Sequence, residues 1–171
     1  MNLTPRLRIF FATAILSLTA FSGAATELDY EKAILLDAED LAEQGIAEAY
    51  ARVLPELTKY VATPLVIQEH IDSHALSYEV SVGSRRYPIY PSSHGGDEYE
   101  SWGVATAALF AIINEQLEDS AVGFYAVNSG NDLMGMFLTP AEAERAQRAL
   151  PRKTEWPYMP ANCPPWFGQR H

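Results

Sequence analysis

Cysteine is almost absent from this chain of 171 residues, because Cys163 is its only one. A single cysteine excludes an internal disulfide, so the stability of the domain must come from packing. Hydrophobic residues make up 48% of the chain and aromatic residues 11%, which is typical of a globular protein with a core. This composition excludes a disordered chain, a collagen-like repeat and a disulfide-dense miniprotein, and the length suits one domain.

Basic residues are also scarce, with 12 Lys and Arg against 22 Asp and Glu and a formal net charge of -10. No basic stripe relieves this imbalance, so we expect no binding to the phosphate backbone of nucleic acids. An acidic protein of this kind instead favours a protein partner with a basic surface. The acidity also has a simpler interpretation, since charged faces often serve only solubility.

Only one long apolar run occurs, from Ile9 to Phe21. It follows Arg6 and Arg8 and ends in small residues, which is the order of a secretory signal peptide cleaved near Ala25. A membrane anchor is the alternative, but the run is shorter than the roughly 20 residues that cross a bilayer. We therefore predict a periplasmic or secreted protein, without membrane insertion after cleavage of residues 1–25.

The N-terminal part of the mature chain has apolar or small residues in steps of three and four from residue 29 to 61, which predicts one long helix. Pro55 predicts a kink or a new short helix near its end. Residues 76–82 alternate between apolar and polar, and Gly83-Ser84 returns the chain into a second strand at residues 85–90, which Pro88 confines to a sheet edge. Residues 64–71 are a weaker candidate for a third strand.

The second half of the chain predicts a helix over residues 102–117 that is apolar nearly all round and therefore central. A second hairpin follows over residues 122–138, with its turn at residues 128–132. Thr139-Pro140-Ala141-Glu142 combines a capping Thr, a first-turn Pro and a third-position Glu, so we expect a helix that begins there and ends at Leu150.

Together these elements predict a single compact α+β domain over residues 26–150. We expect one antiparallel sheet of four or five strands, covered by the long N-terminal helix, the buried central helix and the short C-terminal helix. Residues 151–171 form a tail rich in proline and aromatic residues, which we expect to pack on the domain because exposed aromatic side chains are a liability.

A weak metal-like pattern lies at His70, Asp72 and His74. Two imidazoles and a carboxylate are ligands that suit zinc, and they share one face if the segment is a strand. The ordinary alternative is a polar strand end with its turn. The general base that accompanies many two-histidine zinc enzymes is missing, so we expect no metal and no cofactor.

A second weak pattern is His94 in a loop of serines and glycines, where it has Ser93 or Cys163 as candidate nucleophiles. No strand–nucleophile–helix elbow is present, and Cys163 lies in an extended proline-rich segment without a helix N-terminus that lowers a thiol pKa. We expect Cys163 to be a buried or shielded free thiol, with a disulfide to a partner thiol as the alternative.

Partner-binding residues are expected in two places. The first is the acidic face of the N-terminal helix, with Asp37, Asp40 and Glu43, and the second is the polar turn with Asn128, Ser129, Asn131 and Asp132. The sequence therefore favours a small exported acidic binding protein, narrowed to a periplasmic inhibitor or immunity-type protein that neutralises a basic enzyme. A periplasmic hydrolase that uses His94 with Ser93 or Cys163, or a metal at residues 70, 72 and 74, is the alternative.

Overall fold

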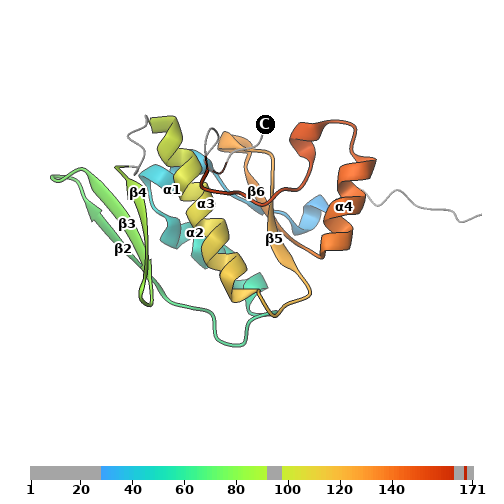
Figure 1. Cartoon of the computed structure of the whole chain (residues 1–171), viewed down its shortest axis with the longest axis horizontal. Coiled ribbons are helices and arrows are strands. Elements are labelled where there is room, and N and C mark those ends of the chain that lie inside the picture. Colours follow the sequence, from blue (N-terminus) through green and yellow to red (C-terminus); the bar gives the residue numbers. More distant parts are fainter. Residues whose placement is uncertain (1–27, 92–97, 164–167, 169–171) are drawn as a thin grey trace, which may run out of the picture.

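The computed structural model describes residues 28–91, 98–163 and 168, which form an α+β fold (Figure 1). Its α-helices are α1 (Ala38–Glu43), α2 (Ile46–Leu57), α3 (Glu98–Gln116) and α4 (Pro140–Ala149). Its strands are β1 (Ile34–Leu35), β2 (Ile67–Asp72), β3 (Ser77–Val82), β4 (Arg85–Tyr90), β5 (Gly123–Val127) and β6 (Met134–Leu138). Three short 3-10 turns complete the described chain: η1 (Tyr30–Lys32), η2 (Gly130–Asp132) and η3 (Lys153–Glu155).

The strands form two antiparallel sheets of three strands, in the orders β1-β6-β5 and β2-β3-β4. The expected single sheet of four or five strands is therefore wrong. The helix α3 contacts both β4 and β5 and lies between the sheets (Figure 1). Its residues Leu109 and Ile113 are fully buried there. Because α3 is apolar nearly all round, it fills the space between two sheets instead of covering one. Its central position, expected from sequence, is confirmed.

The long helix predicted for residues 29–61 is wrong: this segment contains η1, β1, α1 and α2 instead. The carboxylate of Asp37 accepts the backbone N–H groups of Glu39 and Asp40 and so caps a new helix, α1. Gly45 then takes a φ of 112°, which interrupts the helical path before α2 begins. Pro55 lies in the last turn of α2, so no new helix starts at that proline.

Two side chains from the neighbouring sheet hold the start of α2. The carboxylate of Glu69 accepts N–H groups from Ile46 at 2.5 Å and Ala47 at 3.0 Å, and the hydroxyl of Tyr78 donates to the same oxygen. Burial and the carboxylate of Glu69 raise the pKa of the Tyr78 phenol, which keeps it a donor. A Cβ on Gly45 would lie 2.8 Å from the Glu69 carboxylate. Both the positive φ and the lack of room for a side chain therefore favour glycine at this position.

The hairpin predicted around Gly83-Ser84 is confirmed, with Tyr78, Val80 and Val82 buried along β3. Pro88 lies on the edge strand β4, as expected, because a proline has no N–H to offer a further strand. The third strand of this sheet is β2. The strand β3 starts one residue later than predicted, since Leu76 adopts a φ of 49° in the preceding turn.

The sheet β1-β6-β5 has an apolar core on each face. On the face toward α3, the rings of Phe110 and Phe124 stack at 4.7 Å between centroids, and Phe124 meets Phe137 at 4.8 Å. Gly135 leaves room for this arrangement, because a Cβ there would lie 2.0 Å from the Phe124 ring. On the opposite face, Met136 packs with α4 in a second, smaller core.

The helix α4 begins with the predicted capping box. Thr139 accepts the N–H of Glu142 through its hydroxyl, and the Glu142 carboxylate accepts the backbone N–H of Thr139 at 2.8 Å. Past α4, the tail runs back along the edge of β5, where Tyr158 and Ala126 exchange two backbone hydrogen bonds of 2.8 and 2.9 Å. The indole of Trp156 donates to the Leu150 carbonyl. No helix within the described residues is long and apolar enough to cross a membrane.

Candidate protein-interaction surface

The acids of α1 remain at the molecular surface although two of them have local structural roles. Asp37 is the cap of α1, and the carboxylate of Asp40 accepts the side-chain amide of Gln44 at 2.5 Å. Glu43 is exposed. An ionised carboxylate keeps its charge when it accepts a hydrogen bond from a neutral N–H group. The helix α1 and its cap therefore present four acids and no basic residue: Asp37, Glu39, Asp40 and Glu43.

The turn at residues 128–132 has a defined shape. Asn128 adopts a φ of 59° and Gly130 one of 63°, so the chain reverses through two left-handed residues. The hydroxyl of Tyr158, from the tail, donates to the carbonyl of Asn128 at 3.0 Å. The β5-β6 ladder anchors both ends of the turn. The turn is therefore supported from the sheet and from the tail.

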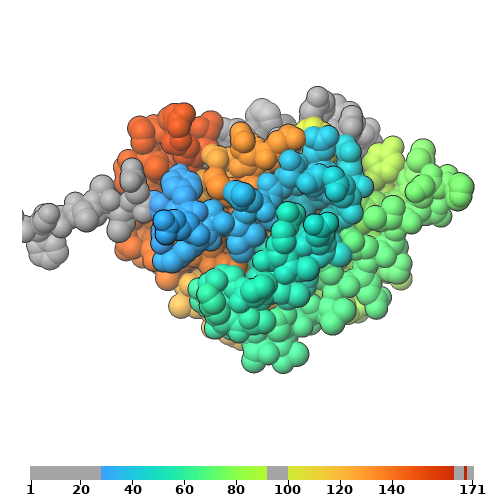
Figure 2. Space-filling view, turned by 180° about the vertical axis from the view of Figure 1, so that it is seen from behind, coloured from blue at the N-terminus to red at the C-terminus, as the bar shows by residue number. Residues whose placement is uncertain are grey.

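The structure brings this turn against α1. The side-chain amide of Asn131 donates to the Glu39 carboxylate at 2.9 Å, and η2 contacts α1. In Figure 2 the turn and α1 occupy neighbouring parts of one face. We refer to residues 37–43 together with residues 128–132 as the acidic surface. Both groups of predicted partner-binding residues lie on it, together with Glu39, which accepts the bond from the turn.

A polar recess of about 370 Å³ adjoins the acidic surface. Its walls are residues of the turn and of the tail around η3: Asn128, Ser129, Asp132, Arg152, Thr154 and Glu155. Arg152 and Glu155 form an ion pair within it. Besides the Arg152 guanidinium, which pairs with Glu155, the recess is lined by the Asp132 carboxylate, two hydroxyls and an amide, which accept N–H groups of a polar or basic side chain.

The three metal candidates do not form a metal site. Asp72 accepts the backbone N–H groups of His74 at 2.8 Å and Ala75 at 2.9 Å, so it shapes the β2–β3 turn. His70 instead lies across the ladder from Glu79, with its Nε2 3.4 Å from the Ser81 hydroxyl. Among the described residues, no group of three or more His, Cys, Asp or Glu side chains is arranged to hold a metal ion.

The hypothesis of a nucleophile activated by His94 concerns residues that lie mainly outside the described part of the chain. Ser93 and His94 lie outside the described residues, as does the predicted signal peptide, residues 1–25. Cys163 is described and is an exposed free thiol in the tail, so the expectation of a buried thiol is wrong. The pairing of His94 with Ser93 or Cys163 stays a prediction.

Comparisons of this chain with protein-family models, with curated proteins and with solved structures find no match. Its function must consequently be argued from its own residues.

Proposed function

We propose that the mature chain is a small exported binding protein that uses the acidic surface to recognise a basic protein partner. The hydrogen bond between Asn131 and Glu39 carries this proposal, because it joins a preformed turn to an acidic helix in one surface. We narrow the role to a periplasmic inhibitor or immunity-type protein that covers the active site of a basic enzyme.

The net negative charge of the chain supports a basic protein as the partner. With a net charge of -10, the chain attracts basic proteins over several ångströms and repels acidic ones. Such steering raises association rates, and its effect falls as salt screens the charges. The helix α1 carries Glu39, Asp40 and Glu43 and no basic residue of its own, which suits a partner face that supplies Lys or Arg side chains.

The ordered structure of the turn at residues 128–132 supports its role as a contact region for the partner. A surface that is already ordered loses little conformational entropy on binding, and this raises affinity without new contacts. The turn meets that condition through the bond from Tyr158 to the Asn128 carbonyl and through the ladder on either side. In the adjoining recess Glu155 already pairs with Arg152, so the place for one basic side chain of the partner is beside Asp132.

The test is recovery of the partner from the native host with a tagged chain at low and high salt. Three chains are compared: wild type, the surface variant Asp40→Asn/Glu43→Gln, and the control Glu118→Gln/Asp119→Asn, which removes two exposed acids from the turn after α3. We expect one stoichiometric basic protein with wild type and control at low salt, and about tenfold less with the surface variant. Equal recovery by all three chains would refute the assigned surface, and no basic protein in any of them would refute the function.

If a partner is recovered, its enzymatic activity is measured with and without this chain. Inhibition at one-to-one stoichiometry is expected for an inhibitor or immunity-type protein. An unchanged activity leaves a binding protein but excludes the narrower role.

A further inference from the structure

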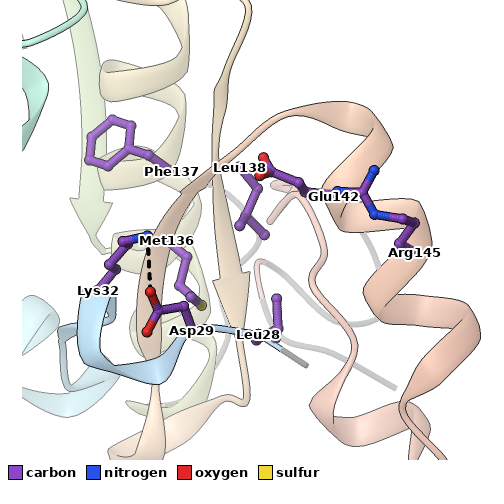
Figure 3. A pocket seen from close by; sticks show the side chains of 8 residues that line it. All are labelled: Leu28, Asp29, Lys32, Met136, Phe137, Leu138, Glu142 and Arg145. Atoms are coloured by element: carbon purple, nitrogen blue, oxygen red, sulfur yellow. Dashed lines mark ion pairs between the residues drawn. The ribbon is translucent and has the colours of Figure 1, made fainter. Parts of the chain in front are cut away.

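A second recess lies on another part of the fold, between η1, β6 and α4 (Figure 3). Its volume is about 260 Å³, just below the range of roughly 300–1,000 Å³ that holds drug-sized ligands, so it suits a smaller molecule. Figure 3 shows Asp29 and Lys32 on one rim and Glu142 and Arg145 on the other. We refer to this site as the α4 recess.

The inner part of the α4 recess is apolar. Leu28, Met136 and Leu138 line it, and each is at least nine-tenths buried. These residues belong to the small core between the sheet and α4. An aliphatic chain laid against them would lose its contact with water, which is favourable by about 25 cal/mol for each Å² of apolar surface buried.

The two acids on the rim already have partners within the chain. Asp29 forms an ion pair with Lys32 at 2.9 Å, which lowers the pKa of that carboxyl and raises the pKa of the Lys32 amine. The Glu142 carboxylate accepts both the N–H and the hydroxyl of Thr139. Neither acid needs a ligand to satisfy it.

Arg145 differs from these three charges. Within the described residues its guanidinium makes no hydrogen bond or ion pair, although its charge contributes to the lowered pKa of Glu142. Arg148, one turn further along α4, instead pairs with Glu144 at 3.5 Å. The planar guanidinium presents several N–H donors in a geometry that matches a carboxylate. The rim of an apolar recess therefore carries one cationic group with unused donors.

We propose that the α4 recess binds a small amphiphilic monocarboxylate, with its aliphatic chain on Leu28, Met136 and Leu138 and its carboxylate on Arg145. A single negative charge fits better than a doubly charged phosphate, because Asp29 and Glu142 stand on the same rim and the whole chain is acidic. This ligand site is independent of the proposed protein partner.

Hexanoate is the probe, with hexanol and hexylamine as comparison ligands of the same chain length. Amide chemical shifts of the purified protein are followed in each titration. We expect saturable shifts with hexanoate in residues 28–32, 136–138 and 142–145, weaker shifts with hexanol, and none with hexylamine. Arg145→Gln should weaken hexanoate binding about fivefold, the value of an exposed ion pair, and Arg148→Gln should leave it unchanged.

Both substitutions are at exposed positions of α4, so the fold is expected to survive them, and the thermal midpoint of each variant checks this. Absence of saturable shifts at these amides with hexanoate would overturn the proposal. The same holds if hexylamine binds as well as hexanoate, or if Arg145→Gln and Arg148→Gln bind hexanoate equally.

Discussion

Asn131 and Glu39 share a hydrogen bond of 2.9 Å although they are 92 positions apart in the chain. One comes from the turn between β5 and β6, and the other from the first turn of α1. The contact explains how an acidic helix and a polar turn form one continuous surface. Exposed hydrogen bonds contribute little to stability, so this contact marks the adjacency of two segments that other interactions hold together, among them the backbone hydrogen bond from Leu36 to Leu133 at 2.9 Å.

The first prediction concerns the support of the turn. Tyr158→Phe removes the hydroxyl that donates to the Asn128 carbonyl but keeps the ring and the backbone pairing with Ala126. We expect the fold to persist, with faster amide hydrogen exchange in residues 128–132 and weaker partner binding. Tyr60→Phe is the control, because the Tyr60 hydroxyl makes no hydrogen bond to the described residues while its ring stacks on Phe137. Equal exchange in both variants would show that Tyr158 does not hold the turn.

The second prediction concerns the break between α1 and α2. Gly45→Ala forces a side chain into a φ of 112° and against the Glu69 carboxylate, so we expect a loss of about 1–3 kcal/mol in the free energy of unfolding. Gly83→Ala is the matched control: its φ is also positive, at 58°, but nothing lies within 4 Å of the added Cβ. Urea denaturation measures both. A larger loss at Gly83 would contradict this explanation of the break.

The third prediction concerns the aromatic stack. Gly135→Ala places a Cβ in the volume of the Phe124 ring, and overpacking of this kind typically costs about 1–3 kcal/mol. Phe124→Leu frees part of that volume. In a double-mutant cycle the two substitutions together should be less destabilising than the sum of their separate effects. Simple additivity would mean that the ring and the glycine do not constrain each other.

The failure to predict the break at Gly45 has a physical reason. The apolar residues of 29–61 keep a helical spacing through the break, so local periodicity does not reveal it. What stabilises the start of α2 is Glu69 and Tyr78, which join it only in the folded chain. The start of the helix at Thr139, in contrast, is predicted to the residue, because its capping groups lie within four consecutive positions.

The sheets and the acidic surface also combine features that local sequence predicts with features that only tertiary packing determines. Each hairpin follows from a local alternation and a turn, but whether two hairpins share a sheet depends on α3, which lies between them. The acids of α1 and the polar turn were identified separately as partner-binding candidates. Their adjacency depends on tertiary packing, and no local pattern indicates it.

The fourth prediction concerns pH. Hydrogen bonds from the backbone and side chain of Thr139 lower the pKa of Glu142 in the folded protein. A lowered folded pKa adds stability above the unfolded pKa of about 4.3, and this stability is lost as the pH falls through the folded pKa. Glu142→Gln should therefore reduce the loss of stability in acid, as measured by urea denaturation from about pH 6 to pH 3. An unchanged pH dependence would contradict the role of this carboxylate.

The most direct test of the proposed function is photo-crosslinking in the native host. A photoreactive amino acid is placed at Ser129, whose side chain makes no capping hydrogen bond, in one chain and at Glu118, outside the acidic surface, in another. We predict that the chain with the probe at position 129 forms an adduct with one basic protein, at an expected one-to-one ratio, and that the chain with the probe at position 118 does not. No adduct from position 129, or the same adducts from both positions, would contradict the account.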